Sequence, residues 1–233
     1  MNSKLLTAFS LVISGFFVQS GVLSAQSKVN LFEGSLSYMI PSGAFGDHIT
    51  SNKIGFELAF LRQIDYEKPF FWGVSAGYFN IGHYNAVTQE IVDFTVYEFN
   101  STTNSNLWGF DGKIRYYPNL NLGPLELYLE ALIGFKWLYT FTRKTLVYDE
   151  DNSSNAFNEG QIALSYGFNA GIQAKLAQDI YLSFKGGFYP GLSVPYYALK
   201  KNNITIYTTL DAFELKRSTT DIMRFDLGVT YRF

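Results

Sequence analysis

The last eleven residues of the chain alternate strictly between apolar and polar side chains. Neighbouring side chains in a β-strand point to opposite faces, so such a segment has one apolar face and one polar face. The polar face contains Arg224, Asp226 and Arg232, which need water or a polar interior. The pattern predicts a membrane-spanning β-strand whose lipid-facing residues are Phe225, Leu227, Val229, Tyr231 and Phe233.

The amino-terminal segment has the order of features found in a secretory signal peptide. Lys4 precedes a mostly apolar, uncharged run from Leu5 to Val18, and small residues follow up to Ala25. The alternative, a transmembrane helix, needs about 20 apolar residues, and this run is shorter. We expect cleavage after Ala25, with residues 1–25 as the signal peptide and residues 26–233 as a single barrel domain.

The rest of the chain has no apolar run long enough for a membrane helix, which leaves a closed barrel as the spanning structure. Aromatic residues make up 18% of the sequence and suit the girdles of such a barrel. The chain has no cysteine, so disulfides are excluded, and a net charge of −2 indicates no nucleic-acid binding.

Eight segments alternate with period two, and each is near the roughly 9 to 11 residues that a tilted strand needs to cross a bilayer. The sequence therefore predicts an all-β fold, a transmembrane eight-stranded antiparallel up-and-down β-barrel with long extracellular loops. The predicted strands are residues 31–40, 54–63, 70–80, 107–117, 125–139, 161–175, 180–189 and 223–233.

The predicted connections alternate between short and long. In bacterial barrels short turns face the periplasm and long loops face outward, so both termini are expected on the periplasmic side. A ten-stranded barrel is an alternative, with an extra hairpin from residues 88–99 or 204–216. Charges in those stretches count against it. The short links are 64–69, 118–124 and 176–179, and the long ones are 41–53, 81–106, 140–160 and 190–221.

Two stretches of the long loops, residues 91–99 and 204–210, are rich in β-prone apolar residues. We expect the strands to continue there as protruding hairpins, with Val92, Phe94 and Val96 on the same even-numbered outward face as Trp108. An exposed sheet edge invites a partner strand. The alternative is that these extensions pack on each other or on lipopolysaccharide.

The segment Pro41-Ser42-Gly43-Ala44-Phe45-Gly46-Asp47 resembles a loop of small outer-membrane barrels of the Bacteroidetes type, although an ordinary Pro/Gly turn explains most of it. The terminal strand ending at Phe233 resembles the signal read by the barrel assembly machinery. Together these features resemble the OmpA-type transmembrane barrel without its periplasmic domain. The resemblance implies the outer membrane of a Gram-negative bacterium, with lipid, lipopolysaccharide and the assembly machinery as partners.

Charged residues on the predicted inner face nearly balance in sign, and an eight-stranded interior is just wide enough to be filled by side chains. A symmetric turn at 118–124 would place Arg115 opposite Glu126, and Asp111 and Lys113 near Glu130. We interpret the set as a packed polar core; a gate for small ions is the alternative. Its members are Glu33, Glu57, Asp111, Lys113, Arg115, Glu126, Glu130, Lys136, Lys175, Lys185, Arg224, Asp226 and Arg232.

Signals for chemistry are weak. His48 and His83 are the two histidines of the chain, and we interpret both as surface residues without a catalytic role. No catalytic residue, metal site or cofactor is predicted, although the acidic run 149–151 has the ligand type of a calcium or lipopolysaccharide-bridging site.

The function that these patterns favour is structural or interactive, with the extracellular loops docking a partner or an envelope component. The alternatives are a narrow pore for ions or small solutes and an enzyme acting on lipid A or peptides. Five aromatic residues near strand ends are expected at the two membrane interfaces, namely Trp72, Tyr116, Tyr117, Trp137 and Tyr231.

Overall fold

The computed structural model describes residues 28–92, 94–118, 120, 122–200 and 208–233. Neither helix within these ranges has the length and apolarity that a transmembrane helix needs. In chain order the elements are β1 (Asn30–Pro41), α2 (Gly43–His48), β2 (Lys53–Gln63), β3 (Phe70–Val92), β4 (Thr95–Tyr116), β5 (Leu125–Leu146), β6 (Asp149–Lys175), β7 (Ile180–Tyr189), β8 (Val194–Leu199), the 3₁₀ helix η1 (Thr209–Ala212), β9 (Phe213–Ser218) and β10 (Ile222–Arg232).

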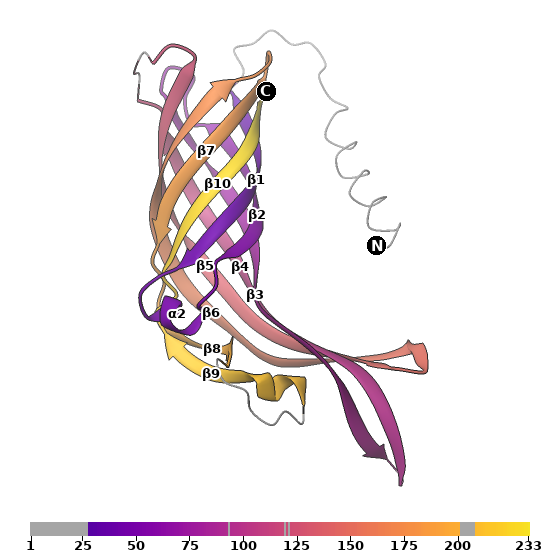
Figure 1. The fold of residues 1–233 in the computed structure, drawn as a ribbon. Helices are drawn as coiled ribbons and strands as arrows, with labels where there is room; N and C mark the ends of the chain where they lie inside the picture. Colours follow the sequence, from indigo (N-terminus) through magenta and orange to yellow (C-terminus); the bar gives the residue numbers. More distant parts are fainter. Residues whose placement is uncertain (1–27, 93, 119, 121, 201–207) are drawn as a thin grey trace.

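Eight antiparallel strands form a closed ring in the order β1-β10-β7-β6-β5-β4-β3-β2 (Figure 1). The first and last strands close the ring by pairing along their whole lengths, from Leu31 with Arg232 to Pro41 with Ile222. A closed ring leaves no strand edge inside the membrane, where lipid offers the backbone no hydrogen bonds. The predicted eight-stranded barrel is confirmed, and the ten-stranded alternative is wrong because β8 and β9 form a separate sheet.

The period-two pattern of each strand separates an apolar outer surface from a polar interior. Leu36 and Ile133 are 67% and 70% exposed on the outside, whereas Glu57 and Arg115 on the inner face are 1% and 0% exposed. In the last strand the predicted outward residues are all exposed and Arg224 and Asp226 are buried. Such a continuous exposed apolar belt on a closed barrel is the surface of a membrane-spanning protein.

The two ends of the barrel differ in their connections. We call the end with the short links 64–69, 117–124 and 176–179 the turn end, and the opposite one the loop end. The first strand begins and the last strand ends at the turn end, where the Asn30 amide donates to the Phe233 carbonyl over 2.7 Å. This arrangement agrees with the predicted alternation of short and long connections.

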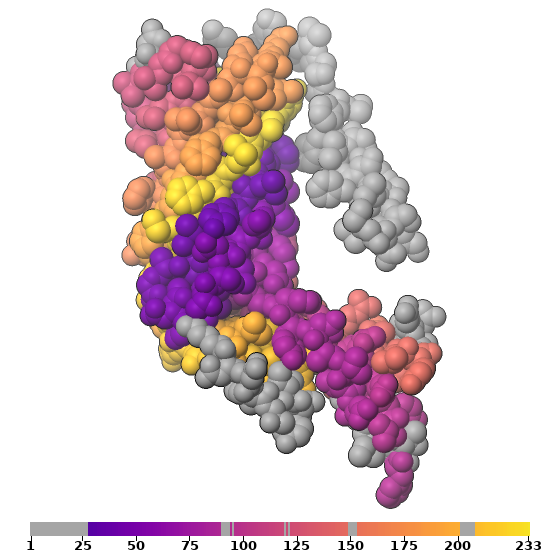
Figure 2. All heavy atoms as spheres, viewed as in Figure 1, coloured from indigo at the N-terminus to yellow at the C-terminus, as the bar shows by residue number. Residues whose placement is uncertain are grey.

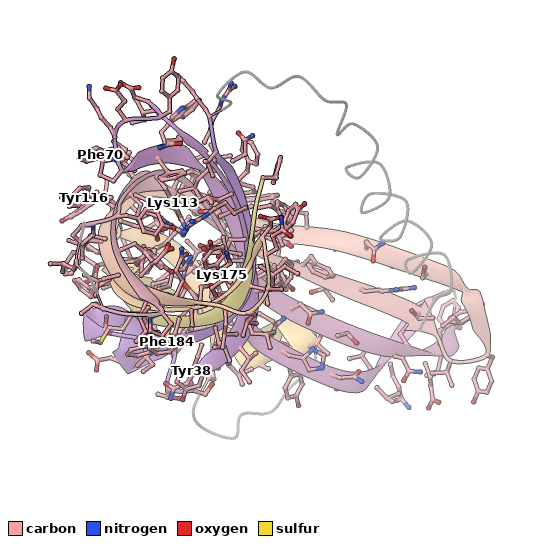
Figure 3. The ribbon with its side chains drawn as sticks, turned by 90° about the horizontal axis from the view of Figure 1, so that it is seen from above. Tyr38, Phe70, Lys113, Tyr116, Lys175 and Phe184 are labelled. Carbon is pink, nitrogen blue, oxygen red and sulfur yellow. The ribbon has the colours of Figure 1, made fainter. Side chains whose placement is uncertain are left out.

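Four strands continue beyond the loop end. The β3–β4 hairpin is paired as far as Val92 and Thr95, and the β5–β6 hairpin is joined to it by pairs such as Phe99 with Leu146. We call this four-stranded sheet, residues 82–105 and 140–160, the extension. Figures 1 and 3 both show it bending sideways beyond the circumference of the barrel. The predicted protruding hairpin is therefore confirmed for residues 91–99.

The parity expected for that hairpin is wrong on β3. A β-bulge between Asn80 and Gly82 shifts the register, so that even-numbered Thr88 is buried beyond it. A bulge adds one residue to one strand and thereby exchanges its two faces. Phe94 lies in the hairpin turn with a φ of 64° and is fully exposed, and the side chain of Val92 lies outside the described set.

The 190–221 connection folds back over the loop end instead of extending a barrel strand. Residues 201–207 lie outside the described residues, and they include most of the 204–210 stretch predicted to extend as a hairpin. The end of that stretch is the 3₁₀ helix η1, and the flanking strands β8 and β9 pair with each other. We call β8, β9, η1 and α2 together the cap. The first long loop, 41–53, contributes the α2 helix to it.

The cap buries an apolar cluster against the loop end of the barrel. Phe45 and Ile49 from the first loop and Tyr196 and Ala198 from β8 are each no more than 5% exposed. The barrel strands contribute inward-facing apolar residues to the same cluster, among them Met39, Phe79, Leu107, Leu138 and Ile222. The cap therefore closes the loop end of the barrel by hydrophobic burial.

Candidate functional site

A network of buried charges fills the middle of the barrel, and Arg115 on β4 lies at its centre. Its guanidinium Nη2 lies 2.7 Å from Glu33 Oε2 on β1 and 2.6 Å from Glu130 Oε1 on β5. The guanidinium also stacks over the ring of Tyr128 at 4.1 Å. Glu130 accepts a further hydrogen bond from Asn169 Nδ2 at 2.6 Å. Glu33, which also accepts from Lys185, and Glu130 are thus each held by more than one donor, as buried charges require.

A second group of contacts joins the other wall of the barrel to this centre. Lys185 Nζ on β7 forms ion pairs with Glu33 and with Glu57, the latter at 2.8 Å. Lys113 Nζ lies 2.6 Å from the same Glu57 oxygen. Arg224 on β10 pairs with Glu57 and, at 3.0 Å, with Asp226. The network therefore links β1, β2, β4, β5, β6, β7 and β10 across the lumen.

The buried charges balance. Figure 3 looks along the barrel and shows Lys113 and other side chains filling the ring, while Phe70, Tyr116 and Phe184 lie outside it. Five carboxylates and five cations of the predicted set are at most 7% exposed. They are Glu33, Glu57, Asp111, Glu130 and Asp226 against Lys113, Arg115, Lys136, Lys185 and Arg224. This geometry fits the predicted packed polar core.

Three other members of the predicted set lie apart from that centre. Arg232 and Glu126 form their own pair at 2.8 Å near the turn end, where both are partly exposed. Lys175 is exposed at the turn-end terminus of β6 and has no ion pair among the described residues, so its predicted place in the network is wrong. Its position beside the 176–179 link lets the ammonium reach water.

The register expected for the β4–β5 pair is also wrong. Arg115 pairs with Glu130, and Asp111 and Lys113 pair with Gly134 and Leu132. Glu126, the predicted partner of Arg115, also lies on the inner face. It is four residues before Glu130, the observed partner, and its cross-strand neighbour is Gln173 on β6. The link is not a symmetric turn, because Tyr116 at the end of β4 pairs with Leu129, four residues after β5 begins at Leu125, and strands in a barrel are staggered by the shear.

The structure adds aromatic and amide side chains to the network that a list of charges omits. Tyr189 lies 4.2 Å beneath the Arg224 guanidinium and hydrogen-bonds to it. Tyr117, expected at the membrane interface, instead turns inward and its hydroxyl donates to Gln173 at 3.1 Å. The inward parity of Tyr128 and Tyr189 was visible in the sequence. Tyr117 also has the odd-numbered parity of Arg115 within the predicted strand 107–117, so its inward turn was visible as well, and its expected place at the membrane interface is wrong.

Lys136 has a different role from the other buried cations. Its Nζ donates to the carbonyl of Tyr189, at 2.6 Å, and to the carbonyl of Thr220. These carbonyls belong to the two ends of the 190–221 connection. Asp221 strengthens the same junction by accepting hydrogen bonds from the Gly191 amide at 3.0 Å and from Thr219 Oγ1 at 2.8 Å. Lys136 therefore fastens the base of the cap to the barrel.

A hydrogen-bonded chain holds α2 to the cap hairpin. His48 Nδ1 lies 2.8 Å from the Tyr196 hydroxyl, which lies 2.7 Å from Ser218 Oγ. Ser218 Oγ donates to the Thr219 carbonyl, so Tyr196 donates to Ser218 and His48 Nδ1 must be the donor to Tyr196. His48 is half-buried, so its interpretation as a free surface histidine is wrong. Burial raises the pKa of the Tyr196 hydroxyl.

The described residues hold no cluster of acidic or histidine side chains suited to a metal ion. The side chains of the acidic run 149–151 lie outside the described set. His83 is exposed and hydrogen-bonds Asn104 Oδ1 at 2.8 Å. Neither histidine bonds a carboxylate within the described part of the chain, so no acid–base pair is assembled there.

No family model and no curated protein matches the chain. Several solved outer-membrane proteins have a low similarity to the chain. Neisserial surface protein A has 11% identity, covers 88% of this chain and 95% of its own, and has a TM-score of 0.42. Ail of Yersinia pestis, in complex with the heparin analogue sucrose octasulfate, has 13% identity, coverages of 89% and 100%, and a TM-score of 0.42. A major outer membrane protein from Thermus thermophilus has 14% identity, covers 89% of this chain and 100% of its own, and has a TM-score of 0.45. Such low similarity leaves function to this chain's own geometry.

Replacing Arg115 alone should destabilise the barrel more than replacing it together with Glu130. Arg115→Met leaves one uncompensated negative charge in the interior and is expected to lower the free energy of unfolding by about 3–5 kcal/mol. Arg115→Met with Glu130→Leu restores neutrality and should lose less. Urea unfolding of the refolded protein, followed by tryptophan fluorescence, measures both.

The control for this comparison is Arg62→Met, which removes an exposed arginine from β2. It is expected to change the free energy of unfolding by less than about 0.5 kcal/mol. A double variant that is less stable than Arg115→Met would contradict a core held together by charge balance.

Raising the pH should loosen the cap through Tyr196. Because the folded cap raises the pKa of this hydroxyl above its ordinary value of 10.0, its contribution to stability is full below that pH and is lost as the pH rises through the folded pKa. An Ala198→Cys reporter, buried at 1% in a chain without cysteine, should react with a thiol reagent faster above that pH. Adding Tyr196→Phe to the Ala198→Cys reporter should reduce this acceleration. If the rate of thiol modification depends on pH in the same way with and without Tyr196→Phe, the tyrosine is not its cause.

Proposed function

We propose that this protein is a sealed outer-membrane anchor that holds the extension outside the cell for docking to a partner protein. The observation that carries the proposal is the extension itself, a four-stranded sheet that a closed barrel does not need. Figure 2 shows it standing clear of the barrel wall as a separate arm. Long connections of bacterial barrels lie on the outer side, which supports placing the loop end outside.

The edges of the extension supply the docking surface. The pairing of β2 with β3 ends at Gly55 with Phe79, so the edge of β3 beyond residue 80 has no neighbouring strand among the described residues. On the other side, residues 190–192 continue the pairing of β6 as far as Leu164, whose carbonyl accepts from the Leu192 amide, and the edge of β6 at residues 149–160 has no paired outer strand among the described residues. Unpaired amides and carbonyls in a row accept an added strand, which gives main-chain affinity. The partner that fits is an extended segment of another protein.

The filled interior supports an anchor over the rival pore. The central charges are buried, eight of the ten form ion pairs with one another, and the cap covers the loop end with apolar side chains. An ion would have to displace paired charges and also open the cap, which Lys136 fastens at both ends of its connection. The rival enzyme has less support, because His48 and His83 bond Tyr196 and Asn104 instead of an acid.

Docking is tested by adding charge to the extension. Val87 and Val96 are exposed at 60% and 56% on the β3–β4 hairpin, and replacing both with Lys should block strand addition as charged residues do on natural sheet edges. Cross-linking on whole cells followed by purification should recover a specific protein with the wild type and lose it with the double variant.

The matched control is Leu215→Lys, which replaces an apolar residue, 54% exposed, on the cap strand β9. This control should retain the partner, because β9 is not part of the extension. Recovery of the partner with the double Lys variant, or an equal loss of the partner with the Leu215→Lys variant, would contradict docking at the extension.

The pure protein should conduct no ions. In a planar bilayer it is expected to give no discrete openings, since the lumen is filled and capped. Discrete openings that persist after repurification would favour the pore. Loss of such openings in a variant that fixes the cap by a disulfide would then place the pathway through the loop end.

A further inference from the structure

The outer face of the extension is turned back toward the plane of the membrane. The extension continues the wall formed by β3, β4 and β5 and bends away from the barrel axis, as the side view and the axial view both show (Figures 1 and 3). A wall that flares outward directs its outer surface at the bilayer beside the barrel. We call the start of this surface the brim face; its residues are Asn80, His83, Asn104, Tyr139, Phe141 and Arg143, with the buried Asn106 beneath them.

One row of the brim face consists of amides that hydrogen-bond one another. Asn80 Nδ2 lies 3.1 Å from Asn106 Oδ1 and 3.3 Å from Asn104 Oδ1. His83 Nδ1 lies 2.8 Å from Asn104 Oδ1, and the Tyr78 hydroxyl donates to Asn106 Oδ1 at 2.6 Å. The amide nitrogen of Asn106 is buried and has no hydrogen-bond partner. These hydrogen bonds fix the row through Asn80 Nδ2 and Asn104 Oδ1, so the remaining amide atoms, Asn80 Oδ1 and Asn104 Nδ2, are those that the row can offer to a ligand, while the buried Asn106 supports the row from beneath.

A row of aromatic rings runs beside the amides on the neighbouring strand. Tyr139 stacks on Trp137 at 4.6 Å and on Phe141 at 6.2 Å, with interplanar angles of 27° and 17°. The register of β4 with β5 places Asn106 opposite Tyr139 and Asn104 opposite Phe141. Each amide thus has an aromatic ring as its cross-strand neighbour.

This combination is the chemistry that recognises a saccharide. Amide side chains both donate and accept, which matches sugar hydroxyls, and aromatic faces pack against the apolar C–H face of a sugar ring. Phosphate recognition uses clustered arginine or lysine instead. Of the six brim residues, Arg143 alone carries a permanent charge.

The position of the brim face selects the source of the sugar. Trp108 and Trp137 pair across β4 and β5, one row closer to the middle of the barrel than Asn106 and Tyr139. On β6 the neighbour of Trp137 in the same row is Ile162, which is 63% exposed on the outer surface. The amide row therefore follows directly on the lipid-facing belt, at the height of the headgroups. A lipid headgroup reaches this height, whereas a free sugar must be captured from solution.

We propose that the brim face binds the sugar headgroup of a glycolipid in the leaflet that surrounds the loop end. The proposal shares with the proposed function the orientation of the loop end toward the outside, but it requires no protein partner. The amides hold the sugar hydroxyls, the rings cover one face of the sugar, and the acyl chains lie on the apolar belt below.

The test uses the purified full chain refolded in lauryldimethylamine oxide, a detergent without sugars that would compete. Native mass spectrometry measures the binding of digalactosyldiacylglycerol, of diacylglycerol and of phosphatidylglycerol. The galactolipid is expected to bind more tightly than either of the others. Asn80→Ala with Asn104→Ala should weaken it about tenfold, as the loss of two hydrogen bonds implies.

The matched control is Asn52→Ala. Asn52 Nδ2 donates to the Tyr38 hydroxyl at 2.5 Å, an exposed amide–tyrosine pair at the loop end on the β1–β2 wall, where no extension begins. This variant should bind the galactolipid like the wild type. His83→Ala, an exposed substitution that leaves the fold intact, should weaken binding by about threefold. Heat-modifiable gel mobility confirms that each variant is folded.

Several results would overturn the proposal. The first is equal binding of diacylglycerol and the galactolipid, and the second is an equal loss in Asn52→Ala and in the Asn80/Asn104 variant. A preference for phosphatidylglycerol would show a face that recognises charge. Displacement of the galactolipid by free digalactose at low concentration would replace the lipid source with a soluble sugar. Because no partner protein is present, none of these results depends on docking at the extension edges.

Discussion

The pairing of β1 with β10 is the constraint on which the rest of the structure depends. It converts eight strands into a ring in which the backbone hydrogen bonds are made between neighbours, and only such a closed form is stable in lipid. Closure at eight strands fixes a lumen that side chains fill. The inward-facing residues must then satisfy one another, which leads to a neutral interior of five buried carboxylates and five buried cations.

A neutral interior is not by itself a strong source of stability. Taking a charge out of water costs several kcal/mol, and a well-made pair recovers that cost only when its remaining lone pairs and protons are also bonded. Arg115 meets this condition, with two carboxylates and the Tyr128 ring around one guanidinium. Glu57 meets it with three cations, Lys113, Lys185 and Arg224. Such many-partner geometry specifies one arrangement of strands and leaves little freedom for partner exchange.

The sequence predicted the strands and their faces well because one rule, alternation in and out of lipid, governs every residue of a membrane barrel. Phe225 and Arg224 are assigned by parity alone. Parity cannot give register, so the sequence predicts Arg115 opposite Glu126, whereas the observed register pairs it with Glu130. It also fails where lipid ends. Beyond Asn80 a bulge exchanges the faces of β3, and the cap depends on contacts distant in sequence, such as Lys136 with the Thr220 carbonyl.

The extension bends where two bulges lie, the one in β3 after Asn80 and a second between Thr140 and Phe141 in the β5–β6 pair. A bulge increases the local twist and bends its strand, and the one in β3 lies where this strand leaves the barrel. Gly82 follows it directly, and a Cβ at this position would lie 2.8 Å from a ring carbon of Phe213, the first residue of β9. Glycine therefore lets the cap pack against the base of the extension. Phe213 of the cap therefore contacts the extension at the point where β3 bends away from the barrel.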